Sequence, residues 1–101
     1  RFRRIRPGFE FEEDSTAAQL RQFCESLCEQ VLADARSTKR EDSWVRVTET
    51  LPSKITVSTN FYCASSGRTQ REFTEDILLM ARARGNESGL VFHEPRRRAQ
   101  M

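Results

Sequence analysis

The sequence predicts one α+β domain, a two-layer sandwich with the ferredoxin-like order β-α-β-β-α-β, in which both helices cover the same face of an antiparallel sheet. Two stretches with apolar side chains every three or four residues predict the helices, and residues 54–63 alternate apolar and polar side chains as a strand does. With 101 residues, of which 37% are hydrophobic and 32% charged, the chain has the size and composition of a single globular domain.

The N-terminal half supplies a short strand and the longest amphipathic stretch. Residues 9–13 alternate Phe with acidic side chains, which predicts a half-buried strand. A helix is expected over residues 15–36, where Thr16 and Gln19 have the spacing of a capping box. Its apolar stripe consists of Leu20, Phe23, Cys24, Leu27, Cys28, Val31 and Ala35.

The middle of the chain predicts a loop followed by two strands. Polar residues 37–42 predict the loop, residues 44–50 a strand, residues 51–53 a turn and residues 54–63 the second strand. The apolar sides carry Val45 and Val47 in the first strand and Ile55, Val57, Phe61 and Cys63 in the second. The opposite side of the second strand carries Thr56, Ser58, Asn60 and Tyr62. This alternation is typical of a sheet with one covered and one open face.

A second helix and a last strand complete the predicted order. The helix is expected over residues 69–84, with Thr69 and Glu72 as its capping box and Gly85 as its end. Its buried stripe consists of Phe73, Ile77, Met80 and Ala81. The segment Leu90–His93, just before a proline, predicts a short final strand.

Basic residues gather at both ends of the chain. We expect residues 1–8 to form a basic N-terminal arm, residues 9–94 the folded domain and residues 95–101 a basic tail. The arginines of the two ends are Arg1, Arg3, Arg4, Arg6, Arg96, Arg97 and Arg98. Of the 17 basic residues 15 are Arg, which suits bidentate binding of phosphate or carboxylate, although a GC-rich codon usage explains the same bias.

The cysteines and the absence of a long apolar run bear on the compartment. The 3 cysteines are an odd number, and Cys24 and Cys28 belong to an apolar helical stripe, so we expect reduced, buried thiols rather than a disulfide framework. No apolar run approaches the roughly 20 residues that cross a bilayer. These observations predict an intracellular protein in a reducing compartment, without a membrane partner.

Catalysis is not expected. The segment from Cys63 to Arg68 superficially resembles the phosphate-binding loop of cysteine phosphatases, but four residues separate the cysteine from the arginine where that loop has five. A loop closed around a phosphate does not keep its geometry when it loses a residue, and Cys63 falls on the apolar side of its strand. Ser66 or Thr69 as a helix cap explains the segment better.

Metal or cofactor binding is not expected either. The candidate ligands are Cys24, Cys28, Cys63 and His93, and their spacing matches neither paired CxxC knuckles nor HExxH. The two helical cysteines are explained by the apolar stripe. His93 is the only histidine and is expected to be an exposed strand residue that faces away from Phe92. No cofactor and no small-molecule substrate is indicated.

The sequence therefore favours a non-enzymatic interaction or assembly domain of a larger complex, whose partner is another protein or an identical subunit. The expected contact surface is the open sheet face, together with the Arg-rich termini. Aromatic residues and Arg are enriched at the energetic centres of such interfaces. The residues assigned to this surface are Trp44, Arg46, Ser58, Asn60, Tyr62 and His93.

RNA binding through the same face is the alternative. Aromatic side chains and Arg on an open sheet can stack on bases, and Arg-rich ends can contact phosphates. However, residues 54–62 lack the RNP1 pattern of an RRM, and the acidic residues at 10–14 repel a nucleic-acid backbone.

Overall fold

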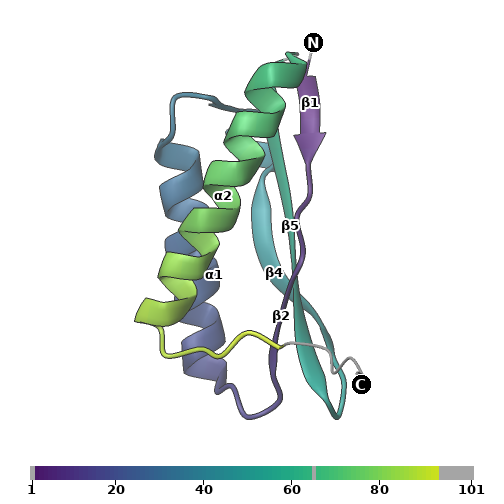
Figure 1. Ribbon diagram of the computed structural model, residues 1–101, viewed down its shortest axis with the longest axis vertical. Helices are drawn as coiled ribbons and strands as arrows, with labels where there is room; N and C mark the ends of the chain where they lie inside the picture. Colours follow the sequence, from purple (N-terminus) through teal and green to yellow (C-terminus); the bar gives the residue numbers. More distant parts are fainter. Residues whose placement is uncertain (1, 65, 94–101) are drawn as a thin grey trace, which may run out of the picture.

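Two helices pack against one side of an antiparallel sheet in the computed structural model of the chain, which describes residues 2–64 and 66–93 (Figure 1). The elements are β1 (Phe2–Ile5), β2 (Phe9–Glu12), α1 (Ala17–Ala33), β3 (Ser37–Thr38), the 3-10 turn η1 (Arg40–Asp42), β4 (Trp44–Thr50), β5 (Lys54–Ala64) and α2 (Gly67–Glu87). Neither described helix is long and apolar enough to cross a membrane. The two helices and the antiparallel sheet confirm the expected α+β class.

Strand β5 is the centre of the sheet. β1 and β2 pair along one of its edges and β3 and β4 along the other, all antiparallel. Figure 1 shows β5 running along the molecule to the right of both helices. The alternation predicted for this strand is confirmed, because Ile55, Val57, Phe61 and Cys63 are buried in the core while Thr56, Ser58 and Tyr62 stay partly exposed.

The N-terminal arginines do not form an arm outside the domain, so this prediction is wrong for Phe2–Ile5. These residues form β1, whose Ile5 pairs with Phe61 and is buried in the core. β1 and β2 follow one path along β5, interrupted at residues 6–8. The hydroxyl of Thr59 donates a 2.6 Å hydrogen bond to the Pro7 carbonyl at this interruption. Two apolar residues among arginines, of which only Ile5 is buried, are a weak sequence signal for a strand.

The predicted final strand is reduced to a single bridge. Phe92 pairs antiparallel with Phe11 on the outer edge of β2. The amide of His93 donates to the Glu10 carbonyl at 2.8 Å, and the amide of Glu12 donates to the Val91 carbonyl at 2.9 Å. The tail expected at residues 95–101 lies outside the described residues.

The loop predicted for residues 37–42 is partly ordered into short elements. Ser37 and Thr38 pair with β5 as β3, and η1 follows before β4 begins. A 3-10 turn and a two-residue strand are too short to produce a periodic pattern in the sequence. Val45 and Val47 lie on the helix side of the sheet as predicted, but Val47 is 40% exposed because it lies at the sheet's edge.

The first helix is shorter than predicted, and its start is correct. Thr16 accepts from the Gln19 amide and the Gln19 side chain accepts from the Thr16 amide, which confirms the capping box. The helix ends at Ala33 rather than at residue 36, so Ala35 is exposed and does not belong to the apolar stripe. The side chain of Asp34 holds Arg36 by two hydrogen bonds just beyond this end.

The second helix is longer than predicted at both ends. Its N-cap is Ser66, whose hydroxyl accepts from the Thr69 amide at 3.3 Å, so the predicted capping box of Thr69 and Glu72 is wrong. Gly85 does not end the helix, which continues to Glu87. The chain turns instead at Gly89, where φ is +79°, a left-handed conformation that glycine adopts without strain.

Gly85 is needed for packing. A Cβ atom at this position would lie 2.8 Å from a ring carbon of Phe92, and the ring of Phe11 lies 4.7 Å from that of Phe92. The absent side chain thus makes room for the aromatic contact through which the C-terminal segment joins the core. The same residue that suggests a helix end in the sequence is a contact site in the structure.

We expect Gly85→Ala to destabilise the fold by about 1–3 kcal/mol, because overpacking outweighs the roughly 1 kcal/mol that Ala gains over Gly in a helix. Urea unfolding with an unchanged m-value measures the difference. Gly67→Ala is the matched control, since its Cβ would only reach Arg71 at 3.5 Å. If Gly85→Ala is as stable as Gly67→Ala, the packing explanation is wrong.

Candidate binding surface

The side of the sheet opposite the helices carries the residues predicted as a contact surface. Trp44 pairs with Asn60 and Arg46 with Ser58 across β4 and β5, so their side chains lie side by side on this face. Tyr62 lies two residues further along the same side of β5. Five of the six predicted surface residues are therefore brought together. Asn60 is the exception in exposure, at 7%.

Tyr62 is held by polar and cationic neighbours. Its hydroxyl accepts hydrogen bonds from Asn60 Nδ2 at 3.2 Å and from Arg4 Nη2 at 3.4 Å. Lys39 Nζ lies 5.4 Å from the centre of the Tyr62 ring and 5.0 Å from that of Phe2. Phe2 is 54% exposed. This end of the face is thus an aromatic patch surrounded by cations, an arrangement with favourable cation–π contacts.

The hydrogen bonds of the Asn60 amide account for its burial and for the pKa of Tyr62. Its Nδ2 group also donates to the Asp42 carbonyl at 3.1 Å, which fixes η1 against β5. The hydrogen bonds from Asn60 and then Arg4 lower the pKa of Tyr62 below its ordinary value, because they stabilise the phenolate. Asn60 therefore orients Tyr62 rather than presenting itself to a partner.

A hollow of about 380 Å³ lies next to Trp44. Its lining comprises Arg6, Gly8, Trp44, Thr48, Ser58 and Thr59. The Arg46 guanidinium stacks over Trp44 at 5.5 Å from the ring centre. A register shift between Val47 and Glu49 marks a bulge at Thr48, whose hydroxyl lies 2.7 Å from that of Ser58. The break between β1 and β2 and the bulge in β4 together shape this hollow.

His93 does not join the other predicted surface residues. Its Nδ1 atom lies 3.2 Å from a carboxylate oxygen of Glu12. Glu12 pairs with Lys54 on β5, and Lys54 is eight residues from Tyr62 along that strand. At about 3.3 Å per residue the two ends of the face are roughly 26 Å apart. His93 does face away from Phe92 as predicted, but the contact with Glu12 leaves its side chain only 22% exposed.

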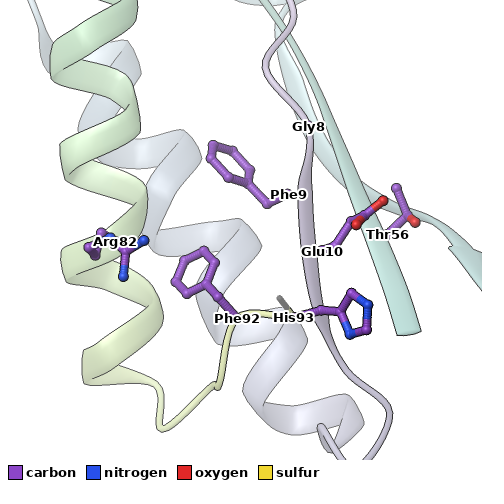
Figure 2. A pocket seen from close by; sticks show the side chains of 7 residues that line it. All are labelled: Gly8, Phe9, Glu10, Thr56, Arg82, Phe92 and His93. Atoms are coloured by element: carbon purple, nitrogen blue, oxygen red, sulfur yellow. The ribbon is translucent and has the colours of Figure 1, made fainter. Parts of the chain in front are cut away.

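Another hollow, also of about 380 Å³, lies at the His93 end of the sheet. Figure 2 shows that its residues belong to two sides of β2: the rings of Phe9 and Phe92 point toward Arg82 and the helices, while Glu10, Thr56 and His93 lie on the opposite side. Lys54 Nζ contacts Glu10 at 2.8 Å. The hollow is therefore a notch at the sheet edge, where Glu10 and His93 contact charged partners and Arg82 stacks over the Phe92 ring at 5.1 Å.

The terminal arginines, like the other predicted surface residues, do not all lie on the open face. Arg4 and Arg6 belong to the open face, whereas Arg3 donates to Gln70 at 3.1 Å at the start of α2. Arg1, Arg96, Arg97 and Arg98 lie outside the described residues. Sequence reasoning did not assign Phe2, Lys39 or Thr48 to the surface. Phe2 and Lys39 reach this surface through the strand register. Phe2 pairs with Ala64, and Thr38, the residue before Lys39, pairs with Tyr62.

The thiols are held in their neutral form. Cys63 is fully buried, and burial raises its pKa. Burial, aided by Cys28 and Glu25, raises the pKa of Cys24 to about 11. Arg68, the arginine of the phosphatase-like segment, contacts Glu72 at 3.2 Å. A reactive cysteine needs the opposite environment, a lowered pKa and access to solvent.

No group of three or more metal-binding side chains occurs within residues 2–64 and 66–93.

We expect Cys63 to react with a thiol reagent only when the domain opens. In a Cys24→Ser, Cys28→Ser variant, which keeps Cys63 as the only thiol, labelling in native buffer should be at least a hundredfold slower than in urea, roughly as global stability dictates. The rate should rise with pH, since the thiolate is the reactive form. Fast native labelling would contradict this account and return Cys63 to consideration as a nucleophile.

Tyr62 is the only tyrosine, so its ionisation can be followed by the near-ultraviolet absorbance of the phenolate. We expect its pKa to lie below the ordinary value near 10 and to rise in Arg4→Gln, which removes one hydrogen bond and a positive charge. Arg46→Gln, which removes the same charge beside Trp44, is the control and should shift the pKa less. Equal shifts would mean that net charge, rather than the direct contact, sets the pKa.

Comparison with known proteins shows similarity of fold only. No protein-family model and no curated protein matches the chain. Solved structures of MSL1 from Arabidopsis thaliana do match, the A320V variant with a TM-score of 0.82 at 11% identity over 93% of this chain and 36% of that one. Two further MSL1 structures give TM-scores of 0.81 and 0.80 at 10% and 12% identity, covering 34% and 33% of those chains. The chain thus spans about a third of the MSL1 chains that share its fold.

Proposed function

We propose that this domain is a non-enzymatic interaction or assembly module whose contact surface is the open sheet face around Trp44 and Tyr62. The observation that carries the proposal is the arrangement of two aromatic rings, each with an Arg stacked on it, on the side of the sheet away from the helices. Large rigid side chains of this kind supply much contact area at a low cost in conformational entropy.

The character of the surface supports a protein partner. Tyr62 is pre-oriented by Asn60 and Arg4, so little side-chain freedom is lost when a partner binds. The match to about a third of the MSL1 chains supports a role as one part of a longer polypeptide, by analogy of fold. We further propose that the partner is another protein or an identical subunit, and that the free thiols reflect a reducing, intracellular compartment.

We also propose a ferredoxin-like classification of the fold. Its support is the order of the segments across the sheet: Phe92 pairs with β2, β2 with β5 and β5 with β4. The path of β1 and β2 then takes the place of the first strand, β4 that of the second and β5 that of the third. The single bridge at Phe92 stands for the fourth.

RNA binding is a second candidate because Arg46 stacks on Trp44, a pair on which a base can stack in turn. Two observations weigh against it. Glu10 and Glu12 lie on the same face as Tyr62, and an extended RNA along β5 would pass over them. Moreover, Asn60 is buried and its amide is bound to Asp42 and Tyr62, so it does not offer a base-reading group.

We expect Trp44→Ala with Tyr62→Ala to weaken association of the natively purified protein by at least tenfold, because two central aromatic contacts are lost. Analytical ultracentrifugation of the full protein, as purified with its retained partners, measures the change. The control is Leu78→Ala with Leu79→Ala, which removes exposed apolar area from α2 instead. Circular dichroism and urea unfolding establish that both variants are folded.

Two results would overturn the proposal. In the first, the folded Trp44 and Tyr62 variant associates as the wild type does. In the second, the wild-type protein is monomeric and retains no other protein through native purification. RNA binding predicts a different behaviour: affinity of the chain for single-stranded poly(U) that falls steeply as salt is raised. Absence of binding at low salt removes that candidate.

A further inference from the structure

We propose that the hollow beside Trp44 binds a carboxylate group of an acidic segment of the partner protein. The inference rests on the proposed function and names the chemistry of the partner at one end of the same surface. It commits to a protein carboxylate because the hollow combines the guanidinium of Arg6, which contacts no carboxylate of residues 2–64 and 66–93, with hydroxyl groups and an aromatic wall in a space of about 380 Å³.

The first argument is charge. Arg6 lines the hollow, Arg46 stacks on Trp44 in its wall, and Arg4 stacks on Tyr62 on the same face of the sheet. None of the three contacts a carboxylate within residues 2–64 and 66–93. Glu10, two residues along the chain from Gly8 of the hollow, is already paired with Lys54 at 2.8 Å. The positive charge near the hollow is thus not neutralised by the described part of the chain.

The second argument is the supply of hydrogen-bond donors. Thr48 and Ser58 have one hydroxyl proton each, and the 2.7 Å bond between them uses only one. One proton therefore remains available to a ligand in the hollow. Together with the guanidinium of Arg6, which donates in a planar fork, this set matches the two oxygens of a carboxylate. The ring of Trp44 forms part of the wall of this hollow.

The third argument distinguishes a protein carboxylate from a nucleic-acid phosphate. A phosphodiester backbone carries a charge at every nucleotide, so a strand along this face would bring phosphates to Glu10 and Glu12 as well as to Arg6. An acidic protein segment can place its carboxylates at the arginines alone and other side chains beyond them. The uneven charge of the face fits the second kind of partner.

The experiment uses a peptide of eight glutamates as the probe and the fluorescence of Trp44 as the signal, since Trp44 is the only tryptophan. We expect a saturable change at low salt, and a roughly three- to tenfold weaker affinity in Arg6→Gln with Arg46→Gln, as for the loss of exposed ion pairs. The control variant Arg21→Gln with Arg71→Gln changes the net charge equally but lies on α1 and α2.

Four results would overturn the inference. The first two are no change in Trp44 fluorescence and an equal loss of affinity in both variants. The other two are tighter binding of poly(U) than of the glutamate peptide at the same salt, and the same fluorescence change with a peptide of eight lysines, which would show adventitious binding. Failure here is distinguishable from failure of the proposed function. If the Trp44 and Tyr62 variant loses association while the glutamate peptide does not bind, the surface is an interface of different chemistry.

Discussion

The strict alternation of side chains along β5 is the constraint on which the rest of the structure depends. A strand exposes successive residues on opposite sides, so its eleven residues define a dry face and a wet face at once. The dry face is covered by α1 and α2, whose Leu27 and Phe73 are fully buried. The wet face has no described element over it, and a slip of one residue in the register would exchange the two.

The pairing of β5 with four short strands depends on the same alternation. β1, β2 and β4 place apolar residues opposite buried residues of β5, for example Ile5 opposite Phe61 and Phe9 opposite Val57, whereas β3 places the buried Ser37 opposite Cys63. The short strands gain stability from this shared core rather than from their own length. This explains how a four-residue segment with three exposed residues, such as β1, is fixed in a sheet.

The sequence predicts the long periodic elements well and the short ones poorly. β5 and the capping box at Thr16 follow from patterns that extend over several residues or have a fixed spacing. β1 was missed because its apolar content is Phe2 and Ile5 among arginines, and its strand form results from tertiary pairing. Gly85 is wrongly predicted as the end of the helix because the sequence does not reveal that Phe92 packs against this residue. For the binding surface, alternation identified Trp44 and Tyr62, but the bulge at Thr48 and the approach of Arg6 depend on strand register.

The contact between Gly85 and Phe92 also restricts how the length of the chain can vary. The link from the helix to the bridge at Phe92 passes through the left-handed turn at Gly89, and the Leu90 amide donates to the Gly85 carbonyl at 2.9 Å. An insertion or deletion between Gly85 and Phe92 would move the Phe92 ring away from the space that Gly85 leaves for it. The turn between β4 and β5, by contrast, has Pro52 and Ser53 exposed. Homologues should therefore differ in length at that turn and keep a constant spacing from the glycine to the aromatic ring.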